Sequence, residues 1–384
     1  MSISRFLGAA AAVTALAMLG ACGGADSSTT TPAESGKSQN SALSAEVEAA
    51  RAEVTTFATP TAGFDASTMR GKTVYYIPIT LKAESFQIVS KSLSEAFQGV
   101  GVTVQACDGG ANPSTAAACL NQALAAHAAG VIADALPVGL AANAFAALRT
   151  AKIPVLIVNQ LRPAGQTDDK LLAYEPGNAI QMQNMAAKWI AADSGGSAKI
   201  LTQEFTDSPN TIAYLEDHAF KTLQSACGGC QNTVNKVSSA NFSLIPSSTS
   251  SALLRNPDTN YLWTEFDTIL QPTMAGVQQA GFLSKVKGVS TNGLLGGLQL
   301  LRAKNYLYAD VAAHYNFQAW ANADSIMRMA LGLDVPADTA IPLRVFDRTN
   351  IDQVKNLDAA GEQSGEWFGP TTYKDVYTKL WSGA

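Results

Sequence analysis

The stretch GKTVYYIPITLKAESFQIVSKSLSEAFQGVGVTVQA, residues 71–106, decides the fold of this chain. β-branched and aromatic residues fill positions 72–79 and predict a strand, and apolar residues at helical spacing over 86–97 predict an amphipathic helix. Residues 100–106 predict the next strand. A strand, a helix and a strand of these lengths are typical of a βαβ unit with parallel strands.

The same alternation continues along the chain in two successive series, which predicts an α/β protein with two doubly wound parallel-sheet lobes. We expect an additional helix at 43–57 on the outside of the first lobe. Further helices are predicted at 113–129, 139–150, 179–192, 211–225 and 272–280, and further strands at 131–135, 153–158, 198–203, 233–237, 261–264, 286–290 and 307–311.

The first residues predict export. A lone Arg5 precedes an apolar stretch that ends at Leu19-Gly20-Ala21-Cys22, so residues 1–21 have the pattern of a secretory signal peptide. The Cys after the cleavage site resembles the bacterial lipobox, in which that Cys is acylated and anchors the protein to a membrane. An ordinary signal peptide with an incidental Cys is the alternative. Residues 22–42 are rich in Gly, Ser, Thr and Pro and predict a flexible stalk.

Composition and charge restrict the function classes. The chain has 384 residues, of which 15% are charged and 47% are hydrophobic, as in globular proteins. A net charge of −5 argues against nucleic acid as a partner. Besides Cys22, four cysteines remain, and in an exported chain Cys107–Cys119 and Cys227–Cys230 are the most local of the three possible disulfide pairings. For the second pair, a redox motif or half of a zinc site are the alternatives.

Motifs for catalysis are not found. The sequence contains no Gly-x-Ser-x-Gly, no phosphate-binding loop and no His-Glu-x-x-His. Asp168 and Asp169 fall in a polar loop, where paired carboxylates are solvated. We therefore expect no catalytic residue, no cofactor and no metal, and interpret the chain as a binding protein rather than an enzyme.

The residues just after the predicted strands are amides, single acids and aromatic rings. Ligands of open α/β sheets bind at the carboxyl ends of the strands, so these positions are candidates for a site. Amides both donate and accept hydrogen bonds, and rings cover apolar faces, which suits a neutral polar ligand.

From Val74 to about Gly332, the chain resembles the sugar-type, ribose-binding-like solute-binding proteins of ABC importers, which have the periplasmic binding protein type I fold. The resemblance rests on the order and spacing of several short motifs, none of them decisive alone. These are GKTVYYI from Gly71, CDGGANP from Cys107, IPVLIVNQ from Ile153, GNA from Gly177, AKIL from Ala198, VSTNG from Val289 and LGL from Leu331. The C-terminal YKDVYTKLW from Tyr373 is similar to tails of actinobacterial members.

This resemblance implies two lobes joined by a three-strand hinge, with the ligand captured between them. The lobes are expected to comprise 43–175 with 314–345, and 176–313 with 346–384, with crossovers near 173–177, 313–316 and 344–347. The implied protein is an extracytoplasmic, lipid-anchored monomer that delivers a small solute to an ABC permease. A lipid-anchored ligand sensor of the same fold without transport is the alternative.

Family binding positions carry over to ten residues: Lys82, Phe86, Asn159, Gln160, Tyr214, Phe242, Phe266, Asp267, Asn292 and His314. Asn159-Gln160 stands where sugar binders commonly have Asp-Arg, so a plain hexose or pentose is less expected than a less hydroxylated or partly aromatic neutral solute. We expect most polar contacts from Asn159, Asp267, Asn292 and His314. A bond from His314 would make binding change between about pH 6 and 7.

Overall fold

The structure, a computed structural model, describes residues 32–336 and 339–383. The chain divides into two units, Met1–Ser38 and Gln39–Ala384, and the second holds the α/β architecture. Of the first unit, only the beginning of helix α1 (Pro32–Arg51) is described. Cys22 and the predicted signal peptide lie outside the described residues.

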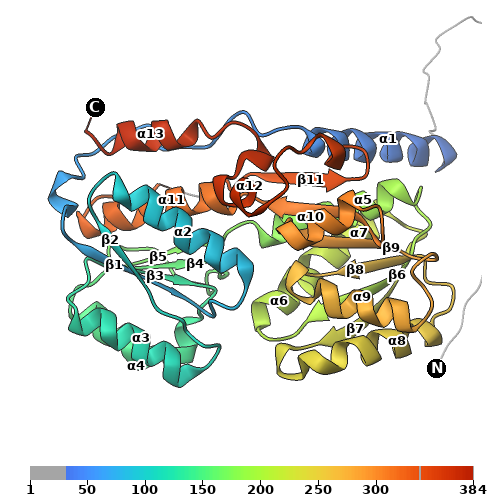
Figure 1. Ribbon diagram of the computed structural model, residues 1–384, viewed down its shortest axis with the longest axis horizontal. Helices are drawn as coiled ribbons and strands as arrows, with labels where there is room; N and C mark the ends of the chain where they lie inside the picture. Colours follow the sequence, from blue (N-terminus) through green and yellow to red (C-terminus); the bar gives the residue numbers. More distant parts are fainter. Residues whose placement is uncertain (1–31, 337–338, 384) are drawn as a thin grey trace, which may run out of the picture. The chain divides into compact units, whose positions relative to one another are not determined.

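The first lobe of the Gln39–Ala384 unit is built on a parallel five-stranded sheet of order β2-β1-β3-β4-β5. The strands are β1 (Thr73–Pro78), β2 (Thr103–Ala106), β3 (Gly130–Asp134), β4 (Val155–Val158) and β5 (Leu172–Glu175). Helices α2 (Glu84–Gln98) and α11 (Tyr315–Ala330) cover one face, and α3 (Pro113–Ala125) and α4 (Ala142–Thr150) cover the other (Figure 1).

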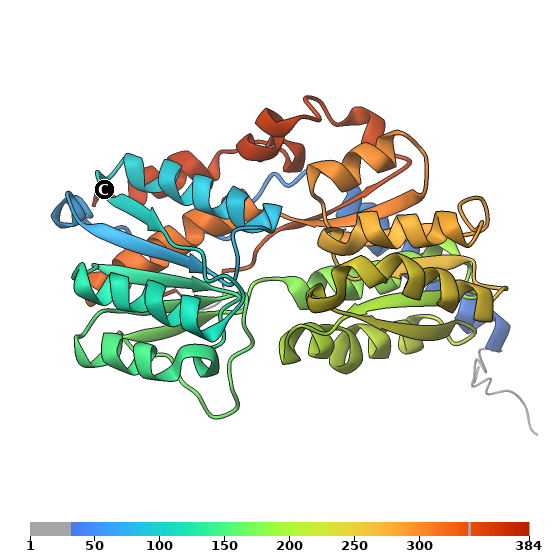
Figure 2. The same cartoon turned by 60° about the horizontal axis from the view of Figure 1, so that its bottom comes forward.

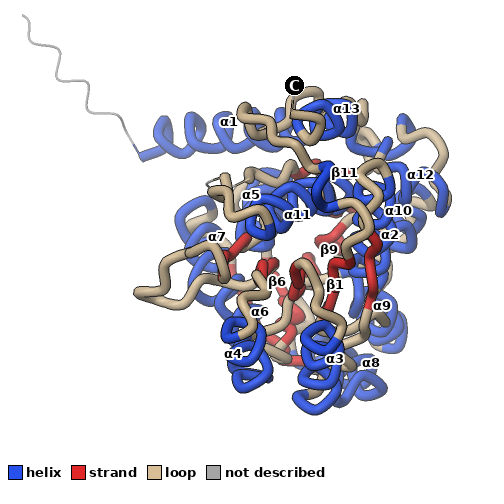
Figure 3. Tube along the Cα trace, turned by 90° about the vertical axis from the view of Figure 1, so that its left-hand side faces the viewer, coloured by secondary structure: helices blue, strands red, loops and turns tan. Residues whose placement is uncertain are grey.

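The second lobe is built on a six-stranded sheet of order β11-β10-β9-β8-β6-β7. Its strands are β6 (Lys199–Phe205), β7 (Gln231–Val237), β8 (Tyr261–Thr264), β9 (Lys287–Asn292), β10 (Leu307–Ala313) and β11 (Leu343–Asp347). One face carries α5 (Ala179–Asp193), the π-helical turn η3 (Tyr214–Ala219) and α7 (Phe220–Ala226), and the other carries α8 (Ile245–Arg255), α9 (Leu270–Gln279) and α10 (Leu295–Arg302). Figure 3 shows the strands inside and the helices outside.

The remaining short elements lie in connections. They are η1 (Ser67–Met69), η2 (Val138–Ala141), α6 (Pro209–Ala213), η4 (Ser239–Leu244), η5 (Asp267–Ile269), η6 (Ile351–Gln353), α12 (Ala359–Ser364), η7 (Glu366–Phe368) and α13 (Tyr373–Leu380).

Local sequence explains why the elements form where they do. Strands β3 and β8 are short apolar runs buried along their whole length, as central strands with helices on both faces must be. Burying one such side chain, for example Leu262, contributes about 1.5–3 kcal/mol. At the start of α3, the Asn112 side chain accepts a hydrogen bond from the Thr115 N–H, and Pro113 occupies the first turn. The predicted two-lobed α/β fold is confirmed.

Several predicted boundaries were wrong. Helix α1 begins at Pro32, so the second half of the predicted stalk is helical, because Pro suits a first helical turn and Ala and Glu have high helix propensity. Helix α8 was missed, because its Ser and Thr run after Pro246 has the composition of a loop. Strand β11 pairs antiparallel with β10, so the second sheet is mixed at one edge rather than all parallel.

The division into lobes also differs from the expected ranges. Strand β11 belongs to the second sheet, so the chain returns to the second lobe between α11 and Leu343, not at 344–347. Conversely, α13 packs in the core of the first lobe, through Tyr373 and Tyr377. Helix α1 packs on the second lobe, where Val47 joins its core. Secondary structure prediction could not reveal this, because it carries no information on which core an outer helix joins.

Both predicted disulfides, Cys107–Cys119 and Cys227–Cys230, are confirmed. The first links the end of β2 to α3, and the second comes directly after α7. Within residues 32–336 and 339–383, no helix has the length and apolar character needed to cross a membrane.

Candidate ligand-binding site

In the first lobe, a buried hydrogen-bond network closes the carboxyl ends of β3 and β4. Asp134 is fully buried and accepts hydrogen bonds from Tyr76 Oη at 2.8 Å and from Asn159 Nδ2 at 2.7 Å. Gln318 Nε2 of α11 donates to Asn159 Oδ1 at 2.8 Å. Burial raises the pKa of Asp134 to about 6, against the lowering effect of the bonds from Asn159 and Tyr76. The predicted site residue Asn159 is therefore held in a fixed orientation by partners on both sides of its amide.

A glycine at the first crossover allows this arrangement. Gly177 has φ +70°, and a Cβ there would lie 2.1 Å from Asn159 Oδ1. Only glycine fits this backbone conformation and this close approach. Asn159 itself has φ +54°, a conformation that Asn adopts more readily than most residues.

Two predicted site residues make hydrogen bonds between the lobes. Gln160 is buried, and its Oε1 accepts a hydrogen bond from Asn210 Nδ2 at 2.5 Å. Tyr214 Oη donates to the Asn159 carbonyl at 3.3 Å. Tyr214 begins the π-helical turn η3, and such turns are frequent at functional sites. The structure therefore brings Asn159, Gln160 and Tyr214 together between the two sheets.

Asp267 has a structural role in the second lobe. Its carboxylate accepts hydrogen bonds from Ser290 Oγ at 2.5 Å and from the Leu294 N–H at 2.8 Å. Burial raises the pKa of Asp267 to about 6. The Asp310 carboxyl group faces it and accepts from the Gly293 N–H at 3.0 Å. Burial, and then the charge of Asp267, raise the pKa of Asp310 well above its ordinary value.

Burial and the neighbouring carboxylate thus both favour the protonated form of Asp310. Asp267 supports β9 and the β9–α10 loop through both of its oxygens, and its contact with a ligand stays a prediction. Sequence reasoning missed Asp310, because a buried acid in a strand gives no signal before the sheet is assembled.

Tyr315 is a site residue that the sequence analysis did not single out. It is the first residue of α11, where the chain passes from β10 in the second lobe to the first lobe. Asn292 Nδ2 donates to Tyr315 Oη, and Asn292 Oδ1 accepts from the Asp267 N–H at 3.3 Å. Burial raises the pKa of Tyr315, and the carboxyl groups of Asp134 and Asp267 add to this effect. The signal available in the sequence was an aromatic residue beside His314 in a predicted crossover.

Glu265 is a second missed residue. It is fully buried at the end of β8, where its Oε2 accepts the Phe205 N–H at 2.6 Å. Its Oε1 has no hydrogen-bond partner among the described residues. Burial raises the pKa of Glu265 well above its ordinary value, and the charge of Glu204 adds to it. Burial raises the pKa of the nearby Tyr214 hydroxyl, and the charge of Glu265 adds to this effect.

The aromatic candidates are placed at accessible positions. Phe86 is half-buried in the first turns of α2, and Phe266 is half-buried after β8. Phe242 is 42% exposed in η4, which comes after the carboxyl end of β7. Lys82 is exposed in the loop after β1. These residues come from the strand ends of both sheets, as a site between the lobes requires.

His314 does not belong with them. It is fully buried, its Nδ1 accepts the Phe317 N–H at 3.4 Å, and its ring stacks on Phe368 with centroids 4.3 Å apart. Burial, and then nearby Lys374, lower the pKa of His314 to about 3. The ring stays neutral at pH 6–7, so the expected change of binding through His314 in that range was wrong.

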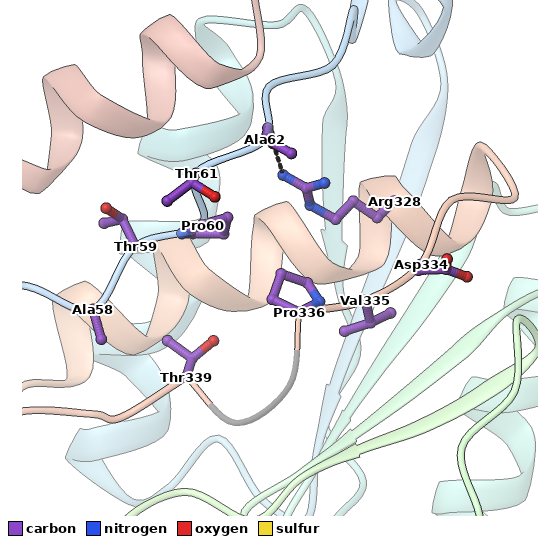
Figure 4. Close-up of a pocket in the computed structure, with 10 residues that line it drawn as sticks. All are labelled: Ala58, Thr59, Pro60, Thr61, Ala62, Arg328, Asp334, Val335, Pro336 and Thr339. Carbon is purple, nitrogen blue, oxygen red and sulfur yellow. Dashed lines mark hydrogen bonds between the residues drawn. The ribbon is translucent and has the colours of Figure 1, made fainter.

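A hollow of about 430 Å³ lies elsewhere, between the segment before β1 and the α11–β11 connection (Figure 4). Arg328 Nη2 donates there to the Ala62 carbonyl at 2.7 Å. Its lining consists of residues 58–62, Arg328, 334–336 and Thr339. No strand end contributes to it, so we do not assign the ligand to this hollow. Among the residues that the structure describes, no three His, Cys, Asp or Glu side chains are grouped so that they could hold a metal ion.

Two doubly wound lobes, several crossovers and polar side chains at the strand ends of both sheets define a solute-binding fold of the type I periplasmic class. The family model described as periplasmic binding protein domain matches residues 74–333. The chain therefore belongs to the periplasmic binding protein family. No curated protein matches the sequence.

Solved structures agree with the fold. The chain is similar to GanP, a glucose-galactose binding protein from Geobacillus stearothermophilus, with 16% identity and a TM-score of 0.62 over 73% of this chain and 98% of that one. A Caulobacter myo-inositol binding protein has 16% identity and a TM-score of 0.65, over 75% of this chain and 98% of that one. An Agrobacterium vitis solute binding protein bound with α-D-tagatopyranose has 17% identity and a TM-score of 0.65, over 73% of this chain and 96% of that one. At these identities the likeness establishes the fold.

Proposed function

We propose that the protein is an extracytoplasmic, lipid-anchored and monomeric solute-binding protein that captures a small neutral solute between its lobes and delivers it to an ABC permease. The observation that carries the proposal is the set of polar and aromatic residues that strand ends of both sheets place between the lobes. Asn210–Gln160 and Asn292–Tyr315 already join the two sides. Such a position allows a ligand to be gripped from both lobes at once.

The chemistry of the site favours a neutral ligand. The polar groups nearest the crossovers are amides and tyrosine hydroxyls, together with acids whose pKa values are raised by burial. Amides and hydroxyl groups bond the hydroxyl groups of a neutral solute well but attract ions weakly. Neighbours of the same fold bind glucose-galactose, tagatopyranose and myo-inositol. The ligand class that these observations support is a sugar, a polyol or a less hydroxylated, partly aromatic analogue.

A thermal-shift screen over sugars, polyols, nucleosides and small aromatics tests this function. A solute that binds only the folded protein raises the melting temperature, and free solute at 100 times Kd adds about 2.7 kcal/mol of stability. Calorimetry of the hit at low and high salt is the next measurement. Affinity should change little with salt, because screening acts on charge pairs. A large loss of affinity in high salt would contradict the neutral ligand, and turnover of the hit would contradict a pure binding role.

We predict that Phe86 and Phe242 cover opposite faces of the bound solute. Alanine at either position should weaken binding of the screened solute by more than about tenfold, or about 1.4 kcal/mol. The exposed Leu254, on the same lobe as Phe242, provides the control, since Leu254→Ala should leave affinity unchanged. Isothermal titration of the three variants measures these affinities. Wild-type affinity in both Phe variants would show that these rings do not contact the solute.

The membrane anchor is a separate prediction. We expect Cys22 to carry all attachment to the membrane, because the lipobox pattern places an acylated Cys there. The Cys22→Ser protein should therefore move from the membrane fraction to the soluble fraction when cells are fractionated. Retention of that variant in the membrane fraction would refute the lipid anchor.

A further inference from the structure

In the described part of the chain, two further segments run between the lobes in addition to the crossovers near β5, β10 and β11. The N-terminal strap, residues 52–66, follows helix α1, whose Val47 lies in the core of the second lobe, and reaches Phe64 in the core of the first. The C-terminal strap, residues 354–373, leads from Phe368 in the core of the second lobe to Tyr373 in the core of the first.

Backbone hydrogen bonds tie the N-terminal strap to the C-terminal strap and to α13. The Val54 N–H of the N-terminal strap donates to the Phe368 carbonyl of the C-terminal strap at 2.6 Å. Near its other end, the N-terminal strap is bonded to the end of α13, where the Phe64 N–H donates to the Leu380 carbonyl at 2.7 Å and the Ala66 N–H to the Trp381 carbonyl at 2.9 Å. Figures 1 and 2 show the blue and red segments side by side. The N-terminal strap is therefore tied to the C-terminal strap at one end and to α13 at the other.

The straps also enclose the second crossover. His314, at that crossover, stacks on Phe368 and makes edge contacts with Tyr373 and Phe57, with ring centroids 5.3 and 5.8 Å away. Gly365 lies so close that a Cβ would be 2.8 Å from His314 Cε1. A crossover at which the lobes must hinge is thus packed inside strap residues.

Helix α12, within the C-terminal strap, forms hydrogen bonds with both lobes through the adjacent residues Glu362 and Gln363. Gln363 Nε2 donates to Ser92 Oγ of α2 at 3.2 Å, and Asn316 Nδ2 of α11 donates to the Gln363 carbonyl at 2.7 Å. On the other side, Glu362 Oε1 accepts the Leu295 N–H of α10 at 2.8 Å. The first two contacts belong to the first lobe, and the third belongs to the second lobe.

We propose that α12 and the two straps form a clasp that limits the separation of the lobes, and that the Glu362–Leu295 contact must break before the lobes open. The proposal rests on the proposed function, in which the lobes move apart to admit a solute. It adds an element of regulation, because access to the site depends on a segment outside both sheets.

The charge around Glu362 makes the clasp sensitive to pH. Burial raises the pKa of Glu362 to about 7 from an ordinary 4.5. The Leu295 N–H and Lys91 of α2 oppose this shift, whereas Glu84 of α2 and Asp267 of η5 reinforce it. When the clasp opens, Glu362 enters water and its pKa falls. Rising pH through 7 therefore favours the open clasp.

A measurement of the distance between the lobes tests whether the clasp limits their separation, and it does not require the solute to be known. Spin labels on Ser114→Cys, at the start of α3, and Ser243→Cys, in η4, report from exposed positions at the strand ends of opposite lobes. All samples carry Cys22→Ser so that no other thiol is free. Double electron–electron resonance is recorded without solute for the labelled reference protein, for Glu362→Ala with Gln363→Ala, and for Ser364→Ala. The last variant loses two local hydrogen bonds of Ser364 Oγ, which donates to the Gly361 carbonyl at 2.9 Å and accepts from the Glu366 N–H at 3.2 Å.

We expect the population of the longer distance to rise about tenfold in the double variant and to stay at the reference level in Ser364→Ala, because two inter-element hydrogen bonds are lost. Equal distributions in the folded double variant and the control would overturn the clasp.

The labelled Glu362→Gln protein provides a second readout that does not depend on the double variant folding. The population of the longer distance should rise from pH 6 to pH 8 in the reference protein but should stay constant in Glu362→Gln. The same growth in both proteins would also overturn the clasp. Failure of the proposed function would appear differently, as distances that no solute changes.

Discussion

Replacing Asp310 with Asn should make the folded protein more stable at pH 8 and leave its stability at pH 4 nearly unchanged. In the wild type, burial raises the pKa of Asp310 well above 3.8. The folded protein therefore holds a proton that the unfolded chain releases, so stability falls as pH rises from about 4 through the raised pKa. Asn is neutral at every pH and can donate to Asp267 as a protonated carboxyl group would. The gain at pH 8 should be at least about 1.4 kcal/mol, the value of one pKa unit.

Urea unfolding at pH 4 and pH 8 measures this difference. Asp352→Asn is the matched control, because Asp352 forms an exposed pair with Lys304. Its stability should differ from the wild type by less than about 0.5 kcal/mol at both pH values. A loss of stability in Asp310→Asn at pH 8 would contradict the raised pKa of Asp310 in the folded protein.

Replacing Phe317 with Ala should destabilise the protein by about 3–5 kcal/mol, the range for large aromatic side chains in a core. Phe317 is fully buried, and its ring contacts Phe57 at 5.1 Å and Tyr373 at 5.3 Å between centroids. These partners come from the N-terminal strap and from α13, so the cavity would loosen three segments at once.

Phe242→Ala is the matched control, since the same change at a side chain that is 42% exposed should cost less than about 1 kcal/mol. Thermal and urea unfolding of both variants give the comparison. Similar losses in the two variants would mean that Phe242 packs as a core residue, which would also weaken its assignment to the ligand site.

The sequence determined the fold class, because strands and helices alternate with periods that local side chains set. The stretch from Lys72 to Ala106 predicts its strands and helix without any distant contact. The sequence as a whole also indicated both disulfides, since short cysteine spacing brings the sulfur atoms within reach of each other. Asn159 and Gln160 could be placed near a site because they come directly after a predicted strand, whereas Tyr214 was placed by the family resemblance.

Tertiary structure alone decided the roles of other residues. His314 and Asp267 have the residue types of ligand contacts, but the straps bury the first and Asp310 faces the second. Tyr315 became part of the site only when β10 and α11 placed it against Asn292. The physical reason is that burial and hydrogen-bond partners come from segments far apart in sequence. Local periodicity specifies the elements, whereas the partners of a polar side chain are specified only by packing between them.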